Sequence, residues 1–165
     1  MIHVVTGDLA STAADAVVRP ATTRLEPLTP ALRRLDEAAG PKFIEQCRVH
    51  RELPPGAAVV TGAGDLAAEF VVHLVLGTAP DTVTTDSVAR AIDAALWQCT
   101  QWHIATLACP IPTAGNLSAD AALRVLLDAV RGHMRQADHP ATVLIVATDD
   151  AEHDLVSARI GQGES

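Results

Sequence analysis

Short apolar runs without polar alternation recur along the whole chain. Thr106–Cys109 has no charged side chain, and Phe70–Leu76 consists mostly of β-branched and aliphatic residues. Such continuous runs are typical of strands that are covered on both faces of a sheet. The pattern predicts strands at Ile2–Val5, Ala16–Val18, Ala57–Thr61, Phe70–Leu76, Thr106–Cys109 and Thr142–Ala147.

Helical spacing of apolar residues appears between these runs. It extends from about Asp86 to Trp102, and again from Ser118, a suitable N-cap, to Met134. Prolines suit the first turn of a helix, so two further helices are expected over 30–39 and 41–49. A last helix is expected to begin with the negative charges of residues 148–150, where the helix dipole favours them.

The order of these elements predicts the fold class. Strand and helix alternate in the second half, which favours parallel strands with helices on both faces of the sheet. The first half has more strands and fewer helices, so we expect an α/β fold with a mixed, partly parallel sheet. The length of 165 residues suits one domain, predicted over 1–160, with a flexible C-terminal tail over 161–165.

Composition narrows the classes of partner. The net charge is -8 and aromatic residues make up 2% of the chain, so neither phosphate neutralisation nor a base-stacking surface is expected. We therefore predict no generic nucleic-acid binding, and no membrane association, since no apolar run is long enough. The absence of a secretion signal and the three unpatterned cysteines predict a cytoplasmic protein with buried thiols. The apolar helices would also suit the surface of a homodimer.

Candidate binding residues follow the ends of predicted strands. Asp8 comes directly after Gly7, Arg19 follows the run Ala16–Val18, and the loop 112–118 joins an apolar strand to a helix start. If these strands are parallel, the three features converge on one crevice beyond their carboxyl ends. A loop before a helix directs backbone N–H groups at one point, which suits a phosphate. For Asp8 the alternative is a local role as a helix cap or in an Asx-turn.

Other polar residues give no catalytic pattern. The seven histidines show no ligand-like spacing, and His73, inside a predicted strand, is interpreted as a hydrogen-bonded structural residue. The serines lack the context of a nucleophile elbow. We predict no metal and no cofactor, and leave catalytic residues unassigned.

Several segments, in order, resemble the macro domain family, which binds ADP-ribose. Gly7-Asp8-Leu9 resembles its Gly-Asp-Ile/Leu, and Ala38-Ala39-Gly40 and Glu45-Gln46-Cys47 resemble its Ala-Ala-Gly and Glu-x-Cys. The strands at 56–61 and 70–75, the latter with His73, also match. Residues 110–115 occupy the place of the family's diphosphate loop. The resemblance covers most of the chain and implies a three-layer α/β/α sandwich with a mixed sheet.

The resemblance also implies a ligand site, in which Asp8 reads the adenine amino group with help from the backbone of Leu9. Three departures weaken it. The family's Val-Asn-Ala-Ala-Asn is replaced by residues 18–22, so that Arg19 and Thr22 stand in place of asparagines, and the glycine-rich run that follows becomes Glu26-Pro27-Leu28-Thr29-Pro30. The adenine-stacking aromatic is replaced near Ala147 and Thr148. The ligand-binding residues expected on this basis are Asp8, Leu9, Arg19, Ala21, Thr22, Pro112, Thr113, Ala114, Gly115, Asn116 and Leu117.

For Arg19 three roles are open: a bidentate contact to phosphate, a plug in the pocket, or a side chain in solvent. The resemblance implies a degenerate macro domain that binds ADP-ribose, a related nucleotide or an ADP-ribosylated protein. Two alternatives remain. One is hydrolysis of an ADP-ribosyl conjugate or deacetylation of O-acetyl-ADP-ribose; the other is an assembly module without ligand.

Overall fold

The computed structural model describes residues 1–163, which form a six-stranded sheet in the order β1-β6-β5-β2-β4-β3. Each strand pairs in parallel with its neighbours except β3, which is antiparallel to β4. The strands are β1 Ile2–Thr6, β2 Ala16–Thr22, β3 Ala58–Gly62, β4 Phe70–Gly77, β5 Thr106–Pro110 and β6 Thr142–Ala147. The predicted mixed sheet is confirmed, and all six predicted strands are present.

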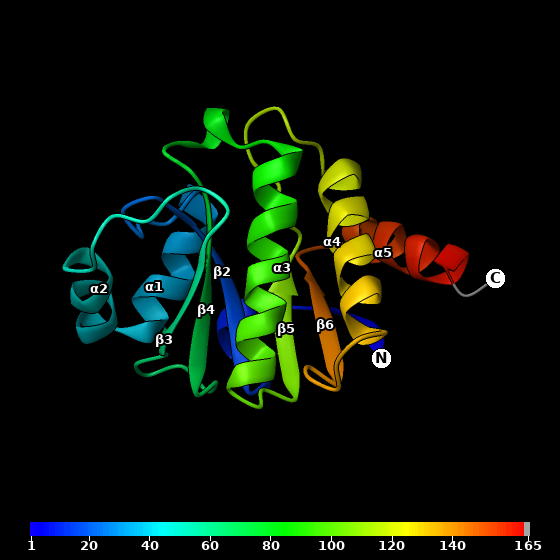
Figure 1. Cartoon of the computed structure of the whole chain (residues 1–165), viewed down its shortest axis with the longest axis horizontal. Coiled ribbons are helices and arrows are strands. Elements are labelled where there is room, and N and C mark those ends of the chain that lie inside the picture. Colours follow the sequence, from blue (N-terminus) through cyan, green and yellow to red (C-terminus); the bar gives the residue numbers. More distant parts are fainter. Residues whose placement is uncertain (164–165) are drawn as a thin grey trace.

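Helices cover both faces of this sheet, which confirms the α/β/α sandwich (Figure 1). Helices α3 and α4 pack together across one face, and α1 and α2 pack on the other. Helix α5 packs against β1 and β6 at the sheet edge and contacts α4. The helices are α1 Arg33–Ala39, α2 Pro41–Arg48, α3 Thr85–Gln101, α4 Ala119–Met134 and α5 Asp150–Gly163, with short 3-10 turns η1 Leu9–Ser11, η2 Pro30–Leu32 and η3 Pro80–Thr82. No helix within the described residues has the length and apolar character of a membrane span.

Side chains of β2 alternate between two separate cores. Ala16 and Val18 join the core under α3 and α4, whereas Val17 and Ala21 join the core under α1 and α2. This alternation follows from the two-residue period of a strand. It places Arg19 on the same face as Val17 and Ala21, directly beneath the two short helices.

Strand β2 is longer than the sequence predicts, which corrects the position of Arg19. The prediction ended this strand at Val18 because Pro20 lacks an N–H, but the strand continues to Thr22. Pro20 is tolerated because β5 pairs with β2 only at Ala16 and Val17. After Val17, the edge of β2 opposite β4 is covered by the loop 23–30 instead of a strand. In this loop the Leu28 N–H donates to the Pro20 carbonyl. Arg19 therefore lies within the strand instead of after its end.

The C-terminal helix extends past the predicted start of the tail. Residues 161–163 belong to α5, and residues 164–165 of the expected tail lie outside the described residues. Helix α5 is anchored to α4 by the side chains of two arginines. Arg131 donates to the carbonyls of Arg159 and Ile160, and Arg159 forms an ion pair with Asp120 at 2.6 Å. These contacts stabilise the last turns of the helix.

Gly64, between β3 and β4, has a backbone conformation and a close contact that only glycine tolerates. Its φ is +57°, and an added Cβ would overlap the Ala39 carbonyl oxygen, which already accepts a hydrogen bond from the Asp65 N–H. We expect Gly64→Ala to lower the free energy of unfolding by about 1–3 kcal/mol, because a side chain is strained in this conformation. Urea denaturation measures the change. Gly62→Ala is the control, since nothing lies within 4 Å of the point that its Cβ would occupy, and an equal loss in both variants would contradict the explanation.

Candidate functional site

A groove lies beyond the shared carboxyl ends of the parallel strands, as the parallel arrangement predicts. Its volume is about 450 Å³, within the range of small-molecule sites. Its walls come from the segments that follow β1, β2, β5 and β6. They comprise Gly7, Asp8, Leu9, Pro20, Thr29, Ala31, Leu32, Arg34, Pro110, Ile111, Thr113, Val146, Thr148 and Glu152.

Asp8 has the capping role that the sequence left open for it, and it also lies on the groove. One carboxylate oxygen caps the turn η1 by accepting from the Ala10 N–H at 3.1 Å, while the residue also lines the groove. The other oxygen accepts from Arg34 Nε at 2.6 Å. Partial burial raises the pKa of Asp8, but the hydrogen bonds from Arg34 and Ala10 outweigh this effect and hold the pKa below its ordinary value. Asp8 is therefore an ionised acceptor at neutral pH.

The loop between β5 and α4 forms a compact turn beside the groove. The Thr113 N–H donates to the Ile111 carbonyl and the Leu117 N–H donates to Ala114, so these two amides serve the loop itself. Gly115 has φ +55°, and its backbone lies so close to the Pro80 carbonyl that a Cβ would overlap it. Within the described chain, the amides of Gly115 and Asn116 have no protein acceptor, whereas Ala114 and Leu117 face each other in a short antiparallel bridge. The Leu117 amide, expected as a donor to phosphate, is engaged within the loop.

The opposite wall, residues 23–30, is folded back onto β2. Thr22 donates its N–H to the Glu26 carbonyl and accepts the Glu26 N–H on its hydroxyl. The Leu28 N–H is bound to Pro20, and prolines at 27 and 30 have no N–H to offer. This loop therefore directs several of its amides at its own strand and away from the groove.

Beneath this wall, Arg19 is held in a buried ion pair. The side chain is 1% exposed, and its Nε and Nη2 donate to the two Asp36 carboxylate oxygens, each at 2.8 Å. The Phe43 ring lies 5.6 Å from the guanidinium carbon. A bidentate pair with an aromatic neighbour compensates part of the cost of desolvating both charges. Three roles were considered for Arg19. The structure excludes a side chain in solvent, because the guanidinium lies inside the protein.

The ion pair continues into a chain of hydrogen bonds across the sheet. Arg19 Nη1 lies 3.2 Å from His73 Nδ1, and His73 Nε2 lies 2.9 Å from the Thr61 hydroxyl, which donates to Gly62. Because Arg19 only donates, Nδ1 accepts and Nε2 carries the proton. Burial and the Arg19 charge lower the pKa of His73 well below its ordinary value. The interpretation of His73 as a satisfied structural histidine is confirmed.

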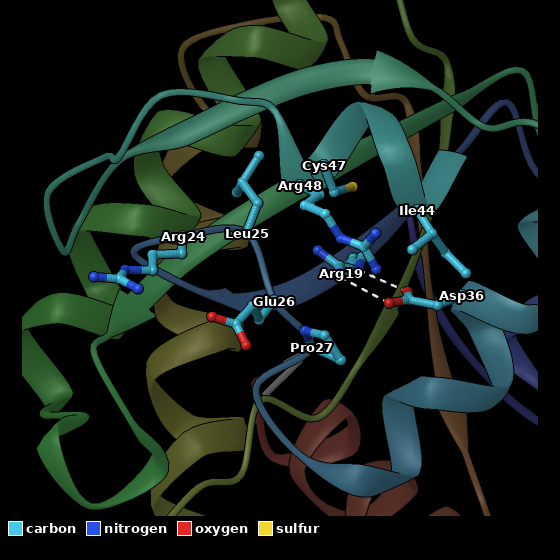
Figure 2. Close-up of a pocket in the computed structure, with 9 residues that line it drawn as sticks. All are labelled: Arg19, Arg24, Leu25, Glu26, Pro27, Asp36, Ile44, Cys47 and Arg48. Carbon is cyan, nitrogen blue, oxygen red and sulfur yellow. Dashed lines mark hydrogen bonds and ion pairs between the residues drawn. The ribbon is translucent and has the colours of Figure 1, made fainter. Parts of the chain in front are cut away.

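The structure brings together only part of the predicted ligand set. Asp8, Leu9 and Thr113 line the groove, whereas the other predicted loop residues, Pro112 and 114–117, are not among its lining residues. Arg19 lines a second cavity of about 400 Å³ on the other side of the loop 23–30, so its predicted convergence with Asp8 is wrong (Figure 2). Ala21 is fully buried in the core, and the Thr22 hydroxyl is engaged in its own turn.

Three charged residues of these sites were missed from the sequence. Arg34 and Glu152 line the groove, and Glu152 accepts the Thr148 N–H at 3.0 Å. Asp36 was missed as the partner of Arg19. A signal existed for Asp36, because it shares the buried face of α1 with Leu35 and Ala39, where an acid requires a cationic partner. No comparable signal marks Arg34.

The fold and groove define an α/β/α domain with a small-molecule site at the carboxyl ends of its strands. The model of the macro domain family matches residues 18–125, and the chain belongs to the macro domain family. An O-acetyl-ADP-ribose deacetylase of Enterobacter sp. (strain 638) is 30% identical over 164 residues, covering 93% of this chain and 90% of that protein. A second O-acetyl-ADP-ribose deacetylase, from Citrobacter rodentium, is 41% identical over 78 residues; that match spans 45% of this chain and 44% of the relative.

Solved structures agree on the fold. The Oceanobacillus iheyensis macrodomain with ADP superposes with a TM-score of 0.86 at 18% identity, covering 98% of this chain and 90% of that one. The Trypanosoma brucei macrodomain in complex with ADP-ribose gives a TM-score of 0.85 at 18% identity, covering 97% of this chain and 69% of that one.

The buried ion pair gives a first test of this site. Asp36→Asn leaves the Arg19 charge buried without its counterion, and we expect the free energy of unfolding to fall by about 3–5 kcal/mol. The double variant Arg19→Met, Asp36→Leu should lose much less than the sum of the single variants Arg19→Met and Asp36→Leu. Asp86→Asn, which breaks the exposed pair with Arg90, is the control and should cost at most about 1 kcal/mol. Additive losses across the double-mutant cycle would contradict the pairing.

The pKa of His73 predicts a pH dependence. Below about pH 6.5 the unfolded chain binds a proton on this residue while the folded chain does not, so stability falls as the pH falls. Urea denaturation between about pH 5 and 7.5 should show this contribution, with a slope of up to about 1.4 kcal/mol per pH unit. His73→Gln should lack it, and parallel curves for the two proteins would show that His73 does not titrate as described.

Proposed function

We propose that this chain binds ADP-ribose or a related adenine nucleotide in the groove beyond β1, β2, β5 and β6. The observation that carries the proposal is the position of Asp8 and of Thr113, where the 113–117 loop begins, on one groove of about 450 Å³ in a macro domain. A relative of this fold is described in complex with ADP-ribose and another with ADP, which supports the choice of ligand.

The groove offers distinct groups to the two ends of such a ligand. Asp8, ionised, accepts a hydrogen bond from the adenine amino group, and the Leu9 backbone lies next to it. The amides of Gly115 and Asn116, which follow Thr113 in the loop, serve the diphosphate, because they have no acceptor within the described residues. The Arg34 guanidinium is exposed beside Asp8 and supplies positive charge to an otherwise acidic groove wall.

Binding is proposed to be weak. The loop 23–30 turns its amides inward, so the diphosphate receives donors from one side of the groove only. Thr148 lines the groove where the family often has an aromatic residue, and a missing base stack costs about 1–3 kcal/mol. Together these differences favour a dissociation constant well above that of a site in which both loops donate to the diphosphate and an aromatic ring stacks on the base.

Calorimetry with ADP-ribose tests the proposal. We expect measurable binding to the unmodified chain and a loss of about tenfold or more in Asp8→Asn, because a hydrogen bond to a charged acceptor contributes about 1.5–3 kcal/mol. The variant should also discriminate less between ADP and inosine diphosphate, which lacks the amino group. Asp93→Asn, on the exposed face of α3, is the control. No heat at millimolar ADP-ribose would exclude the proposed function.

Hydrolysis of an ADP-ribosyl ester is the second candidate, supported by the name O-acetyl-ADP-ribose deacetylase of the relatives. The reaction would add water across the ester and release acetate. Thr22 stands where active members have an asparagine, and its hydroxyl accepts the amides of Arg24 and Glu26. Acetate release that persists in Thr22→Ala and disappears in Gly115→Val would favour this candidate over simple binding.

The cellular setting is part of the same proposal. We propose a cytoplasmic location, because Cys47, Cys99 and Cys109 are buried and unbridged, as in reducing compartments. Burial raises the pKa of Cys99 and Cys109 to about 12, so these thiols are inert. An ADP-ribosylated protein as partner, and a homodimer, remain predictions, and sedimentation with and without ADP-ribose tests the latter.

A further inference from the structure

A second cavity of about 400 Å³ lies on the α1 and α2 face of the sheet (Figure 2). Its walls come from the β2 side chain Arg19, the turn 24–27, and the helices α1 and α2. The lining residues are Arg19, Arg24, Leu25, Glu26, Pro27, Asp36, Ile44, Cys47 and Arg48. None of them lines the groove proposed for the nucleotide, although the loop 23–30 contributes to both.

Arg19 presents unused donors at this cavity. A guanidinium has five N–H groups, and three are engaged, two by Asp36 and one by His73. One N–H on each of Nη1 and Nη2 has no acceptor among residues 1–163, although the side chain is 1% exposed. Leaving a buried charged donor without an acceptor is costly. The geometry therefore favours an acceptor that enters from the cavity.

The charges around the cavity favour an anionic acceptor. Arg24 and Arg48 add two exposed guanidinium groups to its rim, and Arg48 has only a 3.5 Å contact with Glu45. Three arginines face the acids Glu26 and Asp36, which leaves a formal charge of +1. Burial raises the pKa of Cys47, so its thiol adds no negative charge.

We propose that this cavity binds an oxyanion, a carboxylate or a phosphate monoester, carried on a compact apolar body. Arg19 donates to the oxyanion from inside the protein, and Arg48 contacts it from the rim. The cavity is larger than a bare carboxylate or phosphate requires, and Leu25, Pro27 and Ile44 provide apolar contacts for the remaining part of the ligand. This site is separate from the nucleotide groove and does not depend on the function proposed for it.

Titrations followed by NMR test the site with probes of matched shape. Benzoate and phenyl phosphate carry the two oxyanions on the same ring, and benzamide is the neutral counterpart of benzoate. We expect saturable shifts of the Arg19 Nε–H and of the amides of 24–27 and 44–48 with at least one anionic probe, and none with benzamide. The stronger of the two anionic probes identifies the preferred oxyanion.

Arg48→Gln should weaken binding of the anionic probe about two- to fivefold, as expected for an exposed ionic contact. Arg51→Gln, an exposed arginine shortly after α2 that does not line the cavity, should leave affinity unchanged. Both variants retain Arg19, so the buried ion pair is preserved. Saturating ADP-ribose should not displace the probe.

Three results would overturn the proposal. The first is the absence of saturable shifts with both anionic probes at 10 mM, a concentration about tenfold above a millimolar dissociation constant. The others are equal shifts with benzamide and unchanged affinity in Arg48→Gln. Displacement by ADP-ribose, with shifts at Asp8 and Thr113, would place the oxyanion in the groove and also exclude the second site. A failure of ADP-ribose to bind would leave this test valid, because the probes report on the cavity directly.

Discussion

Burial of the Arg19 charge constrains everything around it. A guanidinium at 1% exposure requires a counterion, and Asp36 provides it from α1, so the helix must pack over β2. The Phe43 ring from α2 covers the guanidinium and also stacks on His73 at 5.8 Å. The position of both short helices on the sheet is thereby tied to one side chain in the middle of a strand.

Much of the fold follows from local patterns, while the site depends on contacts that no pattern reports. The apolar runs predict all six strands, because a strand buried on both faces has few polar residues. The limits of β2 were mispredicted because the tolerance of Pro20 depends on where β5 stops pairing, which is a tertiary fact. The Arg34 contact with Asp8 likewise joins two surface residues 26 positions apart without any periodic signal. Asp8 and Thr113 were predicted as groove residues because their strands are parallel and end at the same edge.

The two walls of the groove have diverged in different ways. The 113–117 loop retains Gly115, which no residue with a Cβ could replace without a clash, because the backbone there lies against Pro80. In the loop 23–30, hydrogen bonds to β2 take the place of donors that would point outward. The second loop is thus stabilised as part of the sheet, which limits what it can contribute to a ligand.

The hydrogen bonds from Arg19 through His73 to Thr61 connect β2, β4 and β3 in turn. The surrounding positions of these strands are largely valines, including Val17 and Val18, Val59 and Val60, and Val71 and Val72. A shift of one strand by two residues would keep every side chain on its own face and in places replace one apolar residue by another, such as Val72 by Leu74 or Val60 by Ala58, so apolar packing discriminates less sharply against it. The same shift would separate Arg19, His73 and Thr61 and leave buried polar atoms unpaired. The polar chain therefore adds a specific constraint on the register of the sheet to the one that its hydrophobic residues provide.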